Sequence, residues 1–147
     1  MALDGEYEPN AWDWVADHVA RYEASGGADG GTMKDRPCVV LTTKGARSGK
    51  TRKVPVMRVS DGERYAVVAS LGGAPNNPVW ANNLMTFPQD VRLQDGPRVL
   101  DCTAHLAEGA ERATWWDRAV AAFPEYAEYQ GKTDRVIPVF VLEPVAG

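Results

Sequence analysis

The chain has 147 residues, of which 44% are hydrophobic and 24% are charged, and its formal net charge at pH 7 is -4. These values are typical of one compact globular domain and exclude a disordered, collagenous or coiled-coil chain. The acidic balance argues against a general nucleic-acid-binding protein, and no stretch approaches the ~20 apolar residues that a membrane-spanning helix needs.

The N-terminal region predicts a helix followed by a flexible joint. Apolar residues recur at helical spacing over residues 11–25, where Asn10 is placed to cap the start and Gly26 and Gly27 to end the helix. Residues 26–32 form a Gly-rich joint, so we divide the chain into this helical region, residues 1–32, and a β-barrel domain, residues 33–147. No basic or apolar leader is visible at the start, and we expect a cytoplasmic protein.

The residues that follow are typical of strands joined by tight turns. We expect six strands, over residues 37–43, 52–60, 64–70, 90–94, 98–106 and 136–142. Asp61-Gly62 and Asp95-Gly96 predict hairpins, and Pro138 favours an edge or bulge position for the last strand. Hairpins argue against a doubly wound parallel sheet. The expected fold is therefore α+β, mainly β: a small barrel with flanking helices.

Helical segments interrupt and follow these strands. Asn77 is expected to cap a short helix that starts at Pro78 and ends before Pro88. Residues 110–123 predict a longer helix with Ala113, Trp116, Val120 and Phe123 along its buried side, and Pro124 starts a further helical turn. Cys38 and Cys102 lie in apolar runs, so we expect buried free thiols, with a disulfide between them as the alternative.

A basic cluster is the densest chemical signal. Residues 44–53 hold five of the 16 basic residues and no acidic one. Gly45 and Gly49 would let backbone N–H groups turn toward an anion, and the Arg and Lys side chains would add charge. The alternative is a solvated hairpin loop. A nucleotide-binding P-loop is excluded because Lys44 stands where that motif needs a glycine.

Two further groups of residues suit a ring-bearing ligand. Over residues 69–80 a strand ends at Ser70, turns through Gly72 and Gly73, and enters a helix that presents Trp80. A plain strand-to-helix connection with a core tryptophan is the alternative. Tyr126 and Tyr129 share a helix face, where they could shape a pocket, stack on a ring, donate a proton or belong to the core. No metal-ligand spacing is present, so we expect no metal and favour a cofactor that carries the chemistry.

Four motifs occur in register. They are L-T-T-x-G-x-x-S-G-x-x-R at residues 41–52, V-A-S-x-G-G-A-x-x-x-P-x-W at 68–80, P-x-Y-x-x-Y-Q at 124–130 and T-D-R-x-I-P at 133–138. Over residues 39–144 the chain thereby resembles the deazaflavin-dependent nitroreductase family. The resemblance implies a split β-barrel like that of FMN-binding, pyridoxamine-phosphate-oxidase-like proteins. It also implies coenzyme F420, a 5-deazaflavin with a phosphate and an oligoglutamate tail, with FMN as the alternative cofactor.

By position, the resemblance assigns a set of cofactor-binding residues: Arg47, Ser48, Lys50, Arg52, Val54, Pro55, Ala69, Ser70, Leu71, Gly72, Trp80 and Asn83. The basic residues and Ser48 would bind phosphate or tail oxygens, and the others would border the ring or complete the pocket. Among the catalytic residues, Ser70 would orient the acceptor. Tyr126 and Tyr129 would close the substrate side, with Tyr126 as the favoured proton donor.

The implied activity is that of an F420H2-dependent oxidoreductase. It would transfer a hydride to an apolar, electron-poor acceptor such as a quinone, an enone or a nitroaromatic. The alternatives are an FMN-dependent oxidoreductase on the same barrel and a non-catalytic carrier of deazaflavin or another apolar ligand. Family members can associate with membranes through the N-terminal region, but Asp13, Asp17 and Glu23 favour a helix that packs on the barrel or covers the pocket. Peripheral membrane association is the alternative, and the sequence does not indicate an oligomeric state.

Overall fold

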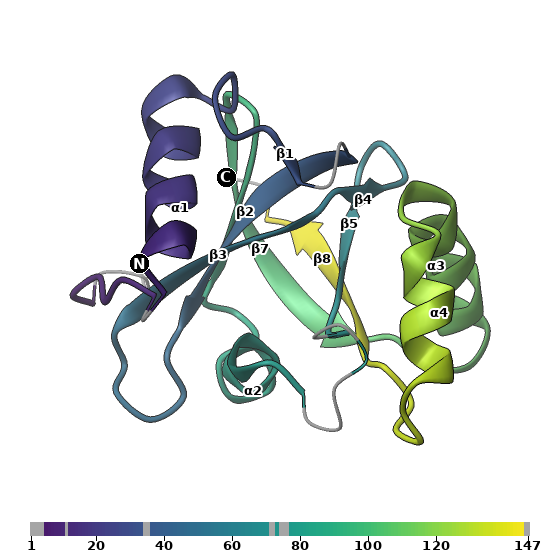
Figure 1. Ribbon diagram of the computed structural model, residues 1–147. Coiled ribbons are helices and arrows are strands. Elements are labelled where there is room, and N and C mark those ends of the chain that lie inside the picture. The colour runs from purple at the N-terminus through teal and green to yellow at the C-terminus, as the bar shows by residue number, and fades with distance from the viewer. Residues whose placement is uncertain (1–4, 11, 34–35, 71–72, 74–76, 146–147) are drawn as a thin grey trace.

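The computed structural model describes residues 5–10, 12–33, 36–70, 73 and 77–145 as an antiparallel, curled half-barrel with flanking helices (Figure 1). The helices are α1 (Asp13–Ser25), α2 (Val79–Thr86), α3 (Gly109–Ala122) and α4 (Glu125–Gly131). The strands are β1 (Thr32–Met33), β2 (Arg36–Lys44), β3 (Thr51–Met57), β4 (Val59–Ser60), β5 (Tyr65–Val68), β6 (Val91–Asp95), β7 (Arg98–Leu106) and β8 (Val139–Pro144). The order in the sheet is β1-β2-β6-β7-β8-β5-β4, and β3 also pairs with β2.

The sheet curls because β3 and β4, which follow each other in the chain, pair with strands at opposite ends of the sheet order. β3 pairs with β2, whereas β4, which begins two residues after β3 ends, pairs with β5. The two strands are separated at Arg58, whose backbone N–H donates to the Pro37 carbonyl at 3.0 Å. The single strand predicted over residues 52–60 is therefore two strands. The prediction of a mainly β split barrel with flanking helices is confirmed.

The position of the last strand differs from the prediction. β8 lies between β5 and β7, and its residues 139–142 are all buried. An edge or bulge position was predicted from Pro138, but Pro138 precedes the strand and so removes no N–H from it. The Pro138 carbonyl instead accepts a hydrogen bond from Ala69 N–H at 2.9 Å.

Apolar side chains fill both faces of β2. Val39 and Leu41 belong to the cluster inside the half-barrel, while Cys38 and Val40 pack on the other face against Tyr22 and Val19 of α1. Cys38 and Cys102 are both buried and free, as expected, and burial raises the pKa of each thiol to about 11.

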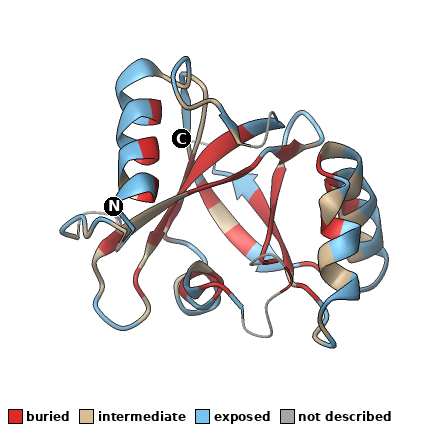
Figure 2. Ribbon diagram, viewed as in Figure 1, coloured by how far each residue is buried: buried red, intermediate tan, exposed pale blue. Residues whose placement is uncertain are grey.

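The helices cover different parts of the half-barrel. α1 lies over β2 and β3, and α3 with α4 lies on the far side against β4, β5 and β8, with red buried positions facing the sheet (Figure 2). α2 lies at one end, where Ala81 and Leu84 enter the interior cluster. α1 begins at Asp13 rather than at the predicted residue 11 and ends, as predicted, at Gly26, whose φ is 62°. Within the described residues, no helix has the length and apolar character needed to cross a membrane.

Candidate functional site

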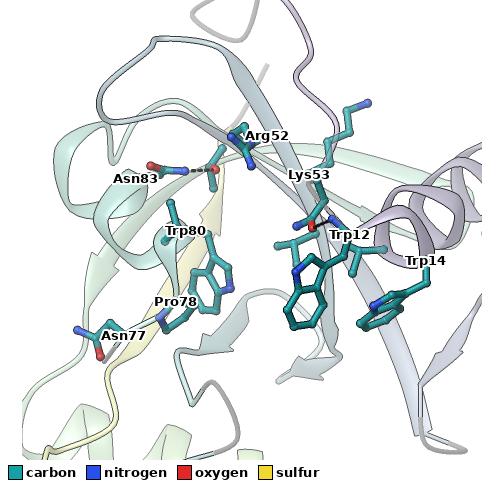
Figure 3. Close-up of a pocket in the computed structure, with 13 residues that line it drawn as sticks. Trp12, Trp14, Arg52, Lys53, Asn77, Pro78, Trp80 and Asn83 are labelled. Carbon is teal, nitrogen blue, oxygen red and sulfur yellow. Dashed lines mark hydrogen bonds between the residues drawn. The ribbon is translucent and has the colours of Figure 1, made fainter. Parts of the chain in front are cut away.

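A pocket of about 480 Å³ opens between the N-terminal region, β3 and the start of α2 (Figure 3). Its volume lies in the range of small-molecule sites, roughly 300–1,000 Å³. The residues that line it are Asn10, Trp12, Trp14, Val15, Thr43, Arg52, Lys53, Val54, Asn77, Pro78, Val79, Trp80 and Asn83. Four of the predicted cofactor-binding residues are among them: Arg52, Val54, Trp80 and Asn83.

Indole rings form much of the apolar wall. Trp80 projects from α2 and meets Phe140 edge-on with ring centroids 6.4 Å apart, which fixes the indole against the barrel interior. Trp12 and Trp14 come from the N-terminal region, and these residues are 66% and 60% exposed, respectively. Trp12 and Trp80 thus project from different elements into the same opening (Figure 3). Such an opening suits a flat, apolar ring.

The cationic side of the pocket already holds carboxylates of the same chain. Arg52 Nη1 donates to Glu8 Oε2 at 2.6 Å, and Lys50 Nζ lies 4.0 Å from Glu8 Oε1. Lys53 Nζ donates to Glu23 Oε2 at 2.6 Å. The Glu8 carboxylate therefore stands where an anionic group would contact Arg52, and shows that this guanidinium can bind an oxyanion.

Backbone pairing brings Glu8 to that place. Residues 5–8 run parallel to the start of β3, with Glu8 N–H donating to the Thr51 carbonyl and Thr51 N–H to the Glu6 carbonyl, each at 2.9 Å. The Thr51 hydroxyl donates to the Gly5 carbonyl at 2.9 Å. These bonds hold the N-terminal segment against the strand that carries Arg52.

The loop between β2 and β3 is closed by its own hydrogen bonds. Gly45 N–H donates to the Lys50 carbonyl at 2.8 Å and Gly49 N–H to the Gly45 carbonyl at 2.9 Å, and Gly49 has a φ of 71°. The Ser48 hydroxyl accepts from Lys50 N–H at 3.1 Å. Those N–H groups are therefore engaged within the loop. Arg47 and Ser48 are exposed on it and do not line the pocket.

Asn83 ties this loop to the pocket wall. Its side chain is 2% exposed. Oδ1 accepts from Ala46 N–H at 2.9 Å, and Nδ2 donates to the Thr43 hydroxyl at 3.0 Å. Both the oxygen and the nitrogen of the Asn83 amide form hydrogen bonds to other residues of the chain. Asn83 therefore positions the loop and the strand end rather than offering free donors to a ligand.

The described residues predicted at the end of β5, Ala69 and Ser70, are not part of the pocket lining. Ala69 and Ser70 are buried and do not line the pocket, and Leu71 and Gly72 lie outside the described residues. Pro55 is likewise buried within β3 and does not line it.

The predicted cap of α2 is wrong. Asn77 Oδ1 accepts from Arg135 Nη1 at 2.7 Å, and α2 begins at Val79 after Pro78 with no side-chain cap.

The two tyrosines belong to the cluster between the sheet and α3. Tyr126 is 4% exposed and packs edge-on against Phe123, with ring centroids 5.0 Å apart. Burial, followed by the neighbouring Tyr129, raises the pKa of Tyr126, so its phenol stays protonated over the physiological range. The Tyr129 hydroxyl donates to Glu125 at 3.3 Å. Neither ring lines the pocket, and their catalytic roles stay predictions.

Other chemistries find little support in the described part of the chain. It contains no cluster of three His, Cys, Asp or Glu side chains that could hold a metal ion. Cys38 Sγ lies 3.8 Å from His18 Nε2, but that nitrogen is 2.6 Å from the Gly30 carbonyl. A thiol with its pKa raised to about 11 is a poor nucleophile.

Sequence reasoning missed the contribution of the N-terminal region to the pocket. The sequence placed Trp12 within a helix over residues 11–25 and predicted no part in the pocket for Trp12, Trp14 or Glu8. Trp12 directly precedes α1 and has extended backbone angles, so helical spacing does not apply to it. Nothing in the local pattern around Glu8 indicates its contact with Arg52, which is 44 residues away.

Comparisons with known proteins agree on one family. Residues 14–144 match the family model described as F420H2-dependent quinone reductase. The chain is 33% identical over 129 residues to an F420H2-dependent quinone reductase of Mycobacterium tuberculosis, covering 85% of this chain and 86% of that protein. A solved structure of an F420H2-dependent reductase is 55% identical, with a TM-score of 0.69 over 76% of this chain and 98% of that one. A second solved structure, described only as a domain-swapped dimer, is 52% identical, with a TM-score of 0.72 over 89% of this chain and 98% of that one.

Proposed function

Because the chain belongs to the F420H2-dependent quinone reductase family, whose members are oxidoreductases that use coenzyme F420, we propose that it reduces an apolar, electron-poor small molecule in the pocket beside Trp80. Quinones, enones and nitroaromatics are the acceptor classes that this chemistry suits. When bound, the reduced deazaflavin supplies the hydride, and the protein supplies position and exclusion of water.

The residues present fit this coenzyme. One pocket combines an apolar wall, made by Trp80, Val54 and Trp12, with Arg52, which already holds a carboxylate at 2.6 Å. A coenzyme with a flat ring and an anionic tail matches these two features, the ring to the apolar wall and the tail to Arg52. This pairing of a ring-sized apolar slot with an oxyanion-binding guanidinium is the observation that carries the proposal. Arg52 and Lys50 would hold the phosphate or tail carboxylates, with Arg47 and Ser48 on the adjoining loop.

The lining residues restrict the protein's own chemical role. Among the described ones, Arg52 and Lys53 are the only titratable side chains, and both are cations that hold carboxylates. The described residues of the wall therefore include no carboxylic acid or imidazole to donate a proton. We propose that the proton reaches the acceptor from solvent or from Tyr126 or Tyr129, and that Ser70 orients the acceptor.

Steady-state turnover tests the proposal. Under anaerobic conditions, oxidation of F420H2 is followed by absorbance with a naphthoquinone, a cyclohexenone and a nitroaromatic in turn. We expect turnover with at least one acceptor. Trp80→Ala should lower kcat/KM about ten-fold, since it removes the aromatic wall of the slot.

Met85→Ala is the matched control. Met85 lies on the same helix, is 60% exposed and does not line the pocket, so this variant should retain wild-type kinetics. Binding of F420H2 without oxidation by any acceptor would instead indicate a carrier. Turnover with reduced FMN alone would indicate a flavin enzyme, and either result would contradict the proposal.

A further inference from the structure

Arg135, from the T-D-R motif, forms hydrogen bonds to both ends of the connection between β5 and α2. Its Nη1 donates to the Ala69 carbonyl at 3.1 Å and to Asn77 Oδ1 at 2.7 Å. Its Nη2 donates to the Ser70 carbonyl at 2.7 Å. One guanidinium thus joins the end of β5 to Asn77, which lines the pocket three residues before Trp80.

Gln130, the last residue of the Tyr-containing motif, fixes the backbone of Arg135 to α4. Its Nε2 donates to the Arg135 carbonyl at 2.8 Å, and its Oε1 accepts from Ile137 N–H at 3.0 Å. The Gln130 side-chain amide therefore forms hydrogen bonds to the backbone on both sides of Val136. Ile137 is fully buried in the cluster between the sheet and α3, so this end of the network is anchored in the core.

The turn that Arg135 holds also rests directly on α4. Gly73 N–H donates to the Ser70 carbonyl at 2.9 Å, and Gly73 has a φ of 83°. A Cβ atom on Gly73 would stand 2.7 Å from the Tyr129 carbonyl oxygen. Because the carbonyl and N–H of one peptide group point in opposite directions, fixing the Ala69 carbonyl also fixes the direction of Ser70 N–H.

We propose that Arg135 and Gln130 form a positioning clamp that sets the pocket wall at Asn77 and Trp80 for coenzyme binding. This proposal depends on the proposed function only for the identity of the ligand, coenzyme F420. Arg135 acts through Asn77 and the backbone of Ala69 and Ser70. Its planar fork supplies several donors in fixed directions, which a lysine ammonium on a flexible stem does not reproduce.

The experiment pairs two measurements on the full-length protein. In the absence of coenzyme, hydrogen exchange followed by mass spectrometry reports on peptides that cover Ala69, Ser70 and Asn77. Separately, titration with F420 reports its Kd. We expect Arg135→Met to accelerate exchange in those peptides but not in β6 and β7, and to raise the Kd for F420 about ten-fold.

Arg112 provides the matched control. Its Nη2 donates to the Ile137 carbonyl at 2.8 Å and its guanidinium lies 4.9 Å from the Trp116 ring centroid, so it also bonds this part of the chain without reaching the pocket wall. Arg112→Met should lower the melting temperature and leave the Kd for F420 within two-fold of wild type. Equal effects of the two variants on Kd would overturn the clamp and leave Arg135 a purely structural residue.

Further variants keep the proposal testable if Arg135→Met does not fold. Arg135→Lys should restore only part of the affinity, and Gln130→Leu should weaken binding in the same direction. Gln130→Leu combined with Arg135→Lys should cost less than the sum of the two, because both act along one path.

Unchanged exchange and unchanged Kd in these variants would overturn the clamp. If the wild-type protein binds no F420 but Arg135 variants still accelerate exchange at Asn77, the proposed function fails while the clamp as a positioning device stands.

Discussion

Arg52 binds a carboxylate of its own chain, so Glu8 competes with any anion that takes the same position on this guanidinium. The contact is 2.6 Å long, and the Arg52 and Glu8 side chains are 33% and 43% exposed. Partly exposed ion pairs contribute little free energy, about 0.2–1 kcal/mol. Glu8 can therefore be displaced, while it keeps the guanidinium compensated when no ligand is present.

Replacing Glu8 should tighten coenzyme binding. Glu8→Gln removes the competing charge, and we expect the Kd for F420 to fall about 1.5- to 5-fold, the range that corresponds to the strength of such a pair. Fluorescence titration of the coenzyme measures this. Glu6→Gln is the control because Glu6 has the same charge, lies in the same segment and contacts β3 through its backbone carbonyl. An equal gain in both variants would show that net charge, not the Arg52 contact, sets the affinity.

Asn83 should matter for stability as well as for the pocket. Asn83→Ala leaves Ala46 N–H and the Thr43 hydroxyl without their partner, and a buried polar group left unpaired costs about 1–3 kcal/mol. We expect urea denaturation to show that loss in the free energy of unfolding. Asn82→Ala changes the exposed neighbouring residue and should cost under about 0.5 kcal/mol.

At this scale, the resemblance named four of the 13 residues that line the pocket. Arg52, Val54, Trp80 and Asn83 line it, and their roles toward a cofactor stay predictions. Glu8, Trp12 and Trp14 could not be found that way. Their place depends on pairing of residues 5–8 with Thr51, a long-range contact that leaves no local pattern. The hydrogen-bond partners of Asn83 could not be predicted either, since a resemblance gives a residue and not its partners.

The positions of the helices and hairpins were predicted well, but the buried face of a helix was predicted less well. Both hairpins and every predicted helix occur, because turn residues and apolar periodicity are local signals. In α3 the predicted inner face was displaced by one position: Trp115 and Ala119 are buried, Trp116 is half-buried and Ala113 is exposed. Trp115 and Trp116 are adjacent, so the sequence pattern allows either of them to face the core. Arg64 and Arg118 lie over the ring of the buried one, Trp115.

The turn after β5 should tolerate no side chain at Gly73. Gly73→Ala meets both a positive φ of 83° and the Tyr129 carbonyl at 2.7 Å. Gly62→Ala meets only a positive φ of 101°, with open space around the new Cβ.

We expect Gly62→Ala to cost about 1–2 kcal/mol from backbone strain. Gly73→Ala should cost about 1–3 kcal/mol more from overpacking. Urea denaturation of both variants measures the difference, and equal losses would mean that the turn shifts away from α4 without cost.

Across the whole molecule, three apolar clusters surround the half-barrel sheet, and the pocket lies where the N-terminal region meets β3 and α2. The interior cluster fixes Trp80 through Phe140, and the cluster under α1 fixes the helix through Val19 and Tyr22. The Tyr22 hydroxyl reaches the Cys38 and Gln94 carbonyls at 3.2 Å and accepts from Gly96 N–H at 2.7 Å. α1 is therefore held firmly, although Trp14 in its first turn and Trp12 just before it line the pocket.

The buried thiols should make stability depend on alkaline pH. Their pKa rises from 9.0 to about 11 on folding, so between these values the unfolded state loses protons that the folded state keeps. The free energy of unfolding must then fall as pH increases from 9 to 11, by up to roughly 2–3 kcal/mol per thiol.

The double variant Cys38→Ala and Cys102→Ala isolates this contribution. It should show a shallower decline of melting temperature over the same pH window, whatever its starting stability. The tyrosines with raised pKa, including Tyr22 and Tyr65, remain in the variant and account for the residual slope. An identical slope in both proteins would mean that the thiols do not titrate differently on folding.

The most direct test of the central claim is a fluorescence titration of the purified protein with F420 and, separately, FMN, at low and high salt. If Trp80 and Arg52 together form the coenzyme site, F420 binds at micromolar concentration or tighter and FMN does not match it. Salt weakens the binding, and Arg47→Ala combined with Arg52→Ala reduces both the affinity and its dependence on salt. A preference for FMN, or F420 affinity unchanged by salt and by the double substitution, would contradict the account.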